Sequence, residues 1–277
     1  AWQLTPSKQQ YMPYRVNVIG PGDQAEKERI WKQAIKNHHK VEDDAIARSL
    51  PIIDATCPLV SKVHAEGRKN AENGCEVILI GHKGHPEVEG TMGRISGTVY
   101  LVSNVNDAKN IVVENPNKLA YVTQTTLSVD DTRDIILELE RRFPKINGPN
   151  VKDICYATQN RQSAVRELTQ QVDLLIVLGA RNSSNSNRLK EIGMELGVPS
   201  YLIDEASQME PSWLNGVSKI GITAGASAPE ELVEELIENL RAICEINLKT
   251  FGDTIEDVIF KLSKELTELS SQTQEIL

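Results

Sequence analysis

The chain has 277 residues, a length that accommodates about two domains with a sizeable buried core. Lysine and arginine total 30 against 39 aspartate and glutamate residues, and the net charge of −9 argues against a general nucleic-acid binder. Apolar runs stay far below the ~20 residues that span a bilayer. We therefore expect a protein without membrane or nucleic-acid partners, located in the cytoplasm or the plastid stroma. Because the first residue is Ala1 rather than methionine, we expect a processed chain or a fragment.

One unit repeats from residue 51 onward: a short β-rich run, a polar loop and an amphipathic helix. The expected strands of these units are 51–56, 76–80, 118–122, 174–178 and 219–222. Apolar residues at helical spacing follow four of these strands, as Leu189, Ile192 and Leu196 do, whereas the strand at 76–80 runs into a loop at 81–90. Strands that alternate with helices predict an α/β fold of repeated parallel domains around a central site.

The N-terminal segment is less regular than the rest of the chain. We expect a strand at 14–19 and a charged helix at 23–37 in it. The strand–loop–helix unit begins near residue 50 and begins again near residue 153. We therefore expect residues 1–50 to be a partial or divergent segment, with the first domain truncated or replaced. We also expect an α/β domain over 51–152 and a second one over 153–277 that includes a C-terminal tail.

The four cysteines are Cys57, Cys75, Cys155 and Cys244, and no Cys-x-x-Cys pair is present. This spacing argues against a zinc ribbon or a thioredoxin-like site, and four cysteines in a chain of this length do not indicate a disulfide scaffold. Cys57 and Cys155 each follow an extended segment with an aspartate and stand where a helix is expected to begin. A helix N-terminus favours the thiolate, which ligates metals or attacks carbon. Cys75 and Cys244 lack that setting and are interpreted as structural.

Polar loops follow two of the expected strands in the second half of the chain. The run 182–187, Asn-Ser-Ser-Asn-Ser-Asn, opens a helix, and its backbone N–H groups and neutral donors predict an anion cradle. Ordinary helix capping is the alternative, since serine and asparagine cap helices well. The run 223–227 is a second strand end of this kind.

Titratable side chains gather in the loop after the strand at 76–80. His82, His85, Glu87 and Glu89 lie within eight residues, a composition that suits proton transfer or metal ligation. Their spacing matches no standard zinc motif, and a solvated loop is the alternative. Hydroxyl groups at 123–126 mark another strand end.

These motifs together resemble the 4-hydroxy-3-methylbut-2-enyl diphosphate reductase family. Six stretches match the family in order and spacing, over about residues 41–265. The matching stretches are Asp54–Val60, Gly81–Met92, Thr123–Asp131, Asp153–Thr158, Asn182–Leu189 and Thr223–Pro229.

The resemblance implies three α/β domains around a [4Fe–4S] cluster that three cysteines hold, with one iron open to the substrate. Two electrons and two protons remove the substrate's hydroxyl as water, which gives isopentenyl and dimethylallyl diphosphates. By position, Cys57 and Cys155 correspond to cluster ligands, Glu87 to the proton donor and Thr125 to a residue near the substrate hydroxyl. The positions that correspond to diphosphate ligands are His85, Ser183, Ser184, Asn185 and Ser227. Ferredoxin or flavodoxin is the implied electron donor.

The chain departs from the family pattern over residues 1–50. The family's first cluster cysteine, in a Gly-Phe-Cys string, has no counterpart, because these residues contain no cysteine. A partner chain, an unrecognised residue or a segment outside this sequence could supply the third ligand. Two alternatives are a degenerate homologue that binds a small diphosphate without reduction, and a different enzyme that uses Glu87 and His85 as acid and base.

Overall fold

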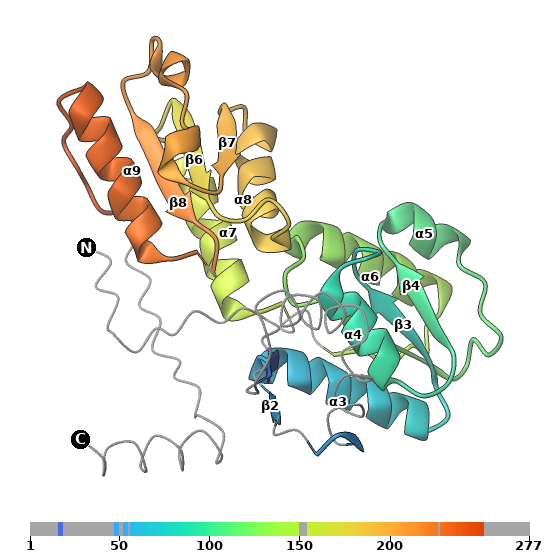
Figure 1. Ribbon diagram of the computed structural model, residues 1–277. Coiled ribbons are helices and arrows are strands. Elements are labelled where there is room, and N and C mark those ends of the chain that lie inside the picture. The colour runs from blue at the N-terminus through green and yellow to red at the C-terminus, as the bar shows by residue number, and fades with distance from the viewer. Residues whose placement is uncertain are drawn as a thin grey trace. The chain divides into compact units, whose positions relative to one another are not determined.

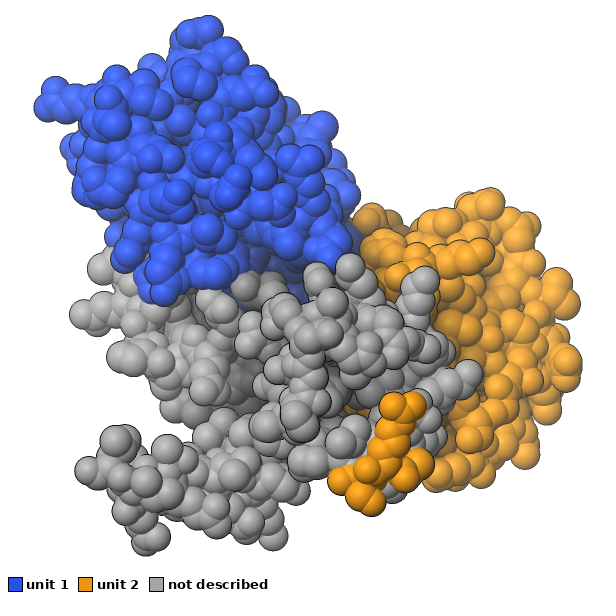
Figure 2. Space-filling model, in the orientation of Figure 1, with its two compact units in different colours: residues 1–11, 126–129, 154–256 blue, residues 12–125, 130–153, 257–277 orange. Residues whose placement is uncertain are grey.

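The computed structural model describes residues 16–18, 47–49, 52–54, 56–149, 154–226 and 228–251. The chain divides into two compact units, coloured separately in Figure 2. Unit 1 takes its described residues from 126–129 and from 154 onward, and unit 2 takes the others. The helix expected at 23–37 lies outside the described residues, as does Ser227.

Unit 2 is built on a parallel three-stranded sheet in the order β4-β3-β5, of which Figure 1 labels β3 and β4. A separate antiparallel pair, β1 with β2, departs from the expected parallel pattern. The elements of this unit are β1 (Val16–Val18), β2 (Ile52–Asp54), α3 (Pro58–Glu72), β3 (Glu76–Ile80), α4 (Pro86–Arg94), β4 (Val99–Val102), α5 (Val105–Asn110), β5 (Leu119–Thr123) and α6 (Val129–Arg142).

The sheet of unit 2 is buried on both faces, as the apolar strand β3 predicts. Val77 and Leu79 pack with Val63 of α3 and Val88 of α4. Ile78 and Ile80, which alternate with them along β3, point to the opposite face and are also fully buried. Burial of such side chains stabilises each by about 1.5–3 kcal/mol, so the two faces fix the register of the strand.

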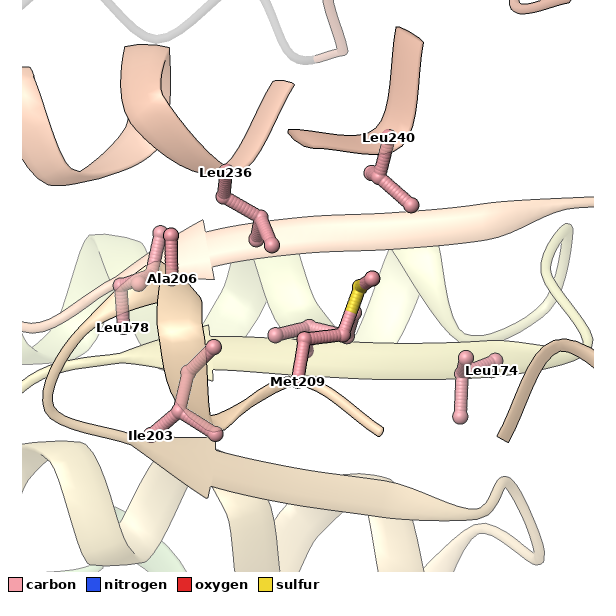
Figure 3. Packing of buried hydrophobic residues seen from close by; sticks show 8 residues of the cluster. Leu174, Leu178, Ile203, Ala206, Met209, Leu236 and Leu240 are labelled. Atoms are coloured by element: carbon pink, nitrogen blue, oxygen red, sulfur yellow. The ribbon is translucent and has the colours of Figure 1, made fainter. Parts of the chain in front are cut away.

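Unit 1 repeats this plan with a parallel sheet in the order β7-β6-β8. Its elements are α7 (Tyr156–Leu168), β6 (Leu174–Leu178), α8 (Ser184–Glu195), β7 (Ser200–Ile203), β8 (Ile220–Ala224) and α9 (Glu230–Ile243), with 3-10 turns at 206–208 and 211–214. On one face, Leu236 and Leu240 of α9 reach toward the sheet beside Leu174 and Met209 (Figure 3). On the other face, α7 and α8 pack on Leu175 and Val177 of β6 through apolar side chains.

Two expectations change with the structure. The strands expected at 118–122 and 219–222 are shifted toward the C-terminus and end at Thr123 and Ala224. Leu196, expected on the buried face of its helix, is 49% exposed. It follows the last residue of α8 as the C-cap, where the helical spacing no longer directs the side chain to the core.

Among the helices described above, none combines the length and the apolar character that a membrane span requires.

Candidate functional site

The carboxyl ends of the parallel strands bear the polar loops in both units, at the sheet edge where α/β proteins bind ligands. In unit 2, three residues directly follow β3, β4 and β5: Gly81, Ser103 and Gln124. The Ser103 hydroxyl donates to the Gly81 carbonyl at 2.8 Å, and the His82 N–H donates to Gln124 Oε1 at 3.0 Å. The loop that leads to α4 is thus held from both neighbouring strand ends.

The packing of Val88 and Gln124 around Gly81 leaves no space for a side chain at this position. A Cβ atom there would lie 2.5 Å from Val88 and 3.1 Å from Gln124 Oε1. Sequence reasoning assigned no role to Gln124 or Ser103, which support this loop. The strand β4, which positions Ser103, was also missed, although Val-Tyr-Leu-Val at 99–102 is a β-rich run that indicates it.

Glu87 lies in the first turn of α4 with only 1% of its surface exposed. Thr125 donates to both carboxylate oxygens, from its backbone N–H at 2.7 Å and from its hydroxyl at 3.0 Å. Burial raises the pKa of Glu87 to about 7, and the two bonds from Thr125 oppose that rise. The carboxyl group of Glu87 can therefore hold a proton at neutral pH, and it is hydrogen-bonded to the Thr125 hydroxyl.

His85 is the N-cap of α4, and its Nδ1 accepts the backbone N–H of Glu87 at 3.2 Å. Burial, with a smaller contribution from the nearby His82, lowers the pKa of His85 to about 4. The imidazole is therefore neutral at pH 7. Because Nδ1 accepts, the ring hydrogen is on Nε2, which is left to donate to an anion.

In unit 1 the polar run after β6 becomes the first turn of α8. Ser183 is its N-cap and accepts the Ser186 N–H at 3.3 Å. The Ser184 hydroxyl donates to the Thr126 carbonyl at 3.2 Å. Asn185 is 4% exposed, and neither its amide oxygen nor its amide nitrogen has a partner among the described residues.

An unpartnered buried amide is costly, by about 1–3 kcal/mol for each unmade bond. At the N-terminus of a 12-residue helix, Asn185 stands where the free N–H groups and the helix dipole attract anions. The sequence predicts a cradle at this position, and the unpartnered amide is the structural observation that favours a ligand there.

Cys57 and Cys155 occupy matching positions, each as the N-cap of a helix and each half-buried. Cys57 precedes α3 in unit 2, and Cys155 precedes α7 in unit 1. Cys155 Sγ accepts the Thr158 N–H at 3.4 Å and lies 3.5 Å from the Thr158 hydroxyl. All four cysteines are described, and none forms a disulfide. In chemistry and exposure, Cys57 and Cys155 fit thiolate ligands of an iron–sulfur cluster.

The other two cysteines stand at the opposite ends of their units. Cys75 follows α3, whose 15 residues put it about 22 Å beyond Cys57. Cys244 caps the C-terminus of α9, which runs back from the carboxyl end of β8. Cys155 lies at that carboxyl end, since Arg161 Nε in α7 donates to the Ala224 carbonyl at 3.2 Å. Over the described ranges, no three His, Cys, Asp or Glu side chains come close enough together to hold a metal ion.

Comparison with known proteins places this arrangement in a family. The model of the LytB protein family matches residues 24–241. The chain belongs to the LytB family. It is 54% identical to 4-hydroxy-3-methylbut-2-enyl diphosphate reductase 1 of Rhodopseudomonas palustris, over 82% of this chain and 74% of that one. It is 56% identical to the 4-hydroxy-3-methylbut-2-enyl diphosphate reductase of Burkholderia pseudomallei, over 82% of this chain and 73% of that one.

A solved structure shares the LytB fold with this chain. The E-1-hydroxy-2-methyl-but-2-enyl-4-diphosphate reductase of Plasmodium falciparum superposes with a TM-score of 0.73 and 36% identity. The superposition covers 80% of this chain and 70% of that structure. The predicted α/β fold and the family resemblance are therefore confirmed. The roles of the individual residues stay predictions.

Proposed function

We propose that this chain is a 4-hydroxy-3-methylbut-2-enyl diphosphate reductase, which removes the hydroxyl group of its substrate as water. The products are isopentenyl and dimethylallyl diphosphates, and two electrons and two protons balance the reaction. Strong identity to reductases of that name supports this activity. The buried pair of Glu87 and Thr125 is the observation in the molecule that carries it, because loss of a hydroxyl group requires a proton donor that is still protonated at neutral pH.

Glu87 is the proposed acid. Its carboxyl oxygen Oε2 lies 3.0 Å from the Thr125 hydroxyl. A proton passes from Glu87 to the Thr125 oxygen as Thr125 gives its own hydrogen to the departing oxygen of the substrate. The backbone N–H of Thr125 remains bound to Oε1 throughout, so the carboxylate that forms keeps one strong donor.

The diphosphate is held by neutral donors in this proposal. Ser183, Ser184 and Asn185 offer hydroxyl, amide and helix N–H groups, and His85 offers its Nε2 hydrogen. The amide nitrogen of Asn185 gains the partner that it lacks when a phosphate oxygen accepts from it. Ser227, which lies outside the described residues, completes the proposed set.

Cys57 and Cys155 are the residues that would hold the cluster, and the cluster when bound supplies the electrons. Ferredoxin or flavodoxin is the proposed donor of these electrons. A third thiolate has to come from a partner chain or a further segment, because Cys75 and Cys244 lie at the wrong ends of their units.

One observation favours a second function, the binding of a small diphosphate without reduction. Only two cysteines of this sequence stand in a ligand setting. A cluster with two thiolates would be more labile than one with the usual larger set of cysteine ligands. The diphosphate-binding residues and the acid do not depend on that cluster.

Anaerobic reconstitution with iron and sulfide tests the proposal. We expect the chain to retain iron and sulfide in equal amounts, the ratio of the family's cluster. We also expect conversion of the substrate when reduced methyl viologen is added, with mass spectrometry detecting both products. Retained diphosphate binding without iron would favour the second function. A full cluster without any product would contradict the reductase.

A further inference from the structure

Ser186 is a buried serine, 1% exposed, in the first turn of α8. It lies between two glycines that directly follow strands, Gly179 after β6 and Gly225 after β8. A Cβ atom added to Gly179 would be 2.3 Å from Ser186 Oγ, and one added to Gly225 would be 2.2 Å from it. Because these distances are shorter than any real contact, the hydroxyl occupies the space that the two missing side chains leave.

The Ser186 hydroxyl donates a hydrogen bond to the side chain of Ser183. Ser186 Oγ donates to Ser183 Oγ at 3.1 Å, and the Ser186 N–H donates to the same oxygen at 3.3 Å. A hydroxyl oxygen has two lone pairs, and these two bonds occupy both of them. The Ser183 oxygen can therefore accept no further hydrogen bond, and its own hydrogen is left to donate.

We propose that Ser186 is a positioning residue of the diphosphate cradle, which directs the Ser183 hydroxyl toward the ligand without touching the ligand. The inference rests on the proposed function in one respect, the binding of a diphosphate by Ser183. An anion accepts hydrogen bonds and donates none, so a hydroxyl already fixed as a donor needs no reorientation when the anion arrives. Donation from Ser186 also polarises the Ser183 O–H bond and strengthens its bond to the anion.

Ser200 offers a matched control in the same unit. Its hydroxyl is also buried and also fills the space beside a glycine, Gly193, whose added Cβ would be 2.1 Å away. It donates to the Val198 carbonyl at 2.8 Å, at the amino end of β7, on the opposite edge of the sheet from Ser186. Loss of this hydroxyl removes a buried hydrogen bond of similar strength without affecting the cradle.

Calorimetric titration of the chain with inorganic pyrophosphate tests the inference, because it requires neither iron nor electrons. We expect Ser186→Ala to weaken binding about tenfold, the effect of one hydrogen bond of ordinary strength. Ser200→Ala should bind within about twofold of the wild type, since its lost bond contributes only to folding. Ser183→Ala should also weaken binding, and adding Ser186→Ala to it should produce no further loss, because Ser186 acts through Ser183.

Gly225→Ala provides a second route to the same outcome if Ser186→Ala fails to fold. It displaces the Ser186 hydroxyl and leaves the serine in place, and we expect a similar loss of affinity. The inference is wrong if Ser186→Ala binds pyrophosphate as tightly as the wild type, or if the wild type does not bind it. It is also wrong if Ser186→Ala weakens binding as much in the Ser183→Ala background as in the wild type. A chain that binds pyrophosphate in this pattern but does not reduce the substrate would disprove the proposed reductase and leave Ser186 in its role.

Discussion

Thr125 donates two hydrogen bonds to Glu87, a residue 38 positions earlier in the chain, and each bond ends on a different carboxylate oxygen. Burial alone favours the protonated acid, whereas the two donors favour the carboxylate. The balance between them sets the pKa of Glu87 to about 7. The group can therefore both hold and release a proton near neutral pH.

Glu87 should make the stability of the chain depend on pH. Its folded pKa of about 7 lies above the ordinary value of 4.5, so the folded chain holds this proton more tightly than the unfolded chain does. The resulting stabilisation is full below pH 4.5 and is lost as the pH rises through about 7. As the pH rises from 4.5 through about 7, we expect the free energy of unfolding of the wild type to fall by on the order of 3 kcal/mol relative to that of Glu87→Gln. Urea unfolding of both chains across this range measures the difference, and parallel curves would contradict the buried acid.

Replacement of Thr125 by valine should lower the reductase activity and shift its pH dependence. The variant keeps the backbone N–H but loses the hydroxyl that relays the proton, so we expect kcat to fall about 10²-fold. Loss of that donor raises the pKa of Glu87 further, so the decline of activity at high pH should move to higher pH. Initial rates between pH 5.5 and 9 provide the measurement.

Thr132 is the matched control for that variant. Its hydroxyl is buried in α6 and has no hydrogen-bond partner among the described residues. Thr132→Val should leave both kcat and its pH profile unchanged, because the hydroxyl that it removes is not engaged. If the two valine variants lost activity equally, the relay through Thr125 would be wrong.

The four cysteines should divide into two pairs when each is replaced by serine. Cys57→Ser and Cys155→Ser remove thiols at helix N-termini, and we expect reconstituted iron to fall to less than about a quarter of the wild-type content, since clusters depend on thiolate ligands. Cys75→Ser and Cys244→Ser act as controls and should keep it, because both lie far from the ligand position in their own unit. Iron and sulfide counts on the four variants decide the point. Full retention in Cys155→Ser would exclude it as a ligand.

The packing of Ser186 predicts a stability compensation. An added Cβ at Gly225 would lie 2.2 Å from Ser186 Oγ but 3.4 Å from Ser186 Cβ. Gly225→Ala should therefore lower the free energy of unfolding by about 1–3 kcal/mol, the usual cost of overpacking. In a Ser186→Ala background the colliding oxygen is absent, and most of that loss should disappear. Urea unfolding midpoints for the wild type, the two single variants and the double variant measure this coupling. If the two losses in free energy of unfolding simply add, the clash is relieved elsewhere.

Several elements could be predicted from the sequence because their signal is local. The strands β3 and β6 were predicted with the bounds that the structure has, since each is an apolar run buried on both faces and flanked by turn residues. The short helix α5 carries no apolar periodicity, and the Asn104 cap rather than a buried stripe marks its start. The edge strand β7, only half buried at Tyr201 and Leu202, was also missed.

The sequence by itself determined the chemistry available at the ends of the strands: an acid, hydroxyl groups, two thiols before helices and a serine-rich helix start. Only the tertiary structure decided which of these groups meet. The bonds from Thr125 to Glu87 and the packing of Ser186 against Gly225 join residues that are far apart in the chain. Such contacts depend on which strands pair and in what register, because neighbouring strand ends bring separate loops to the same edge of a sheet.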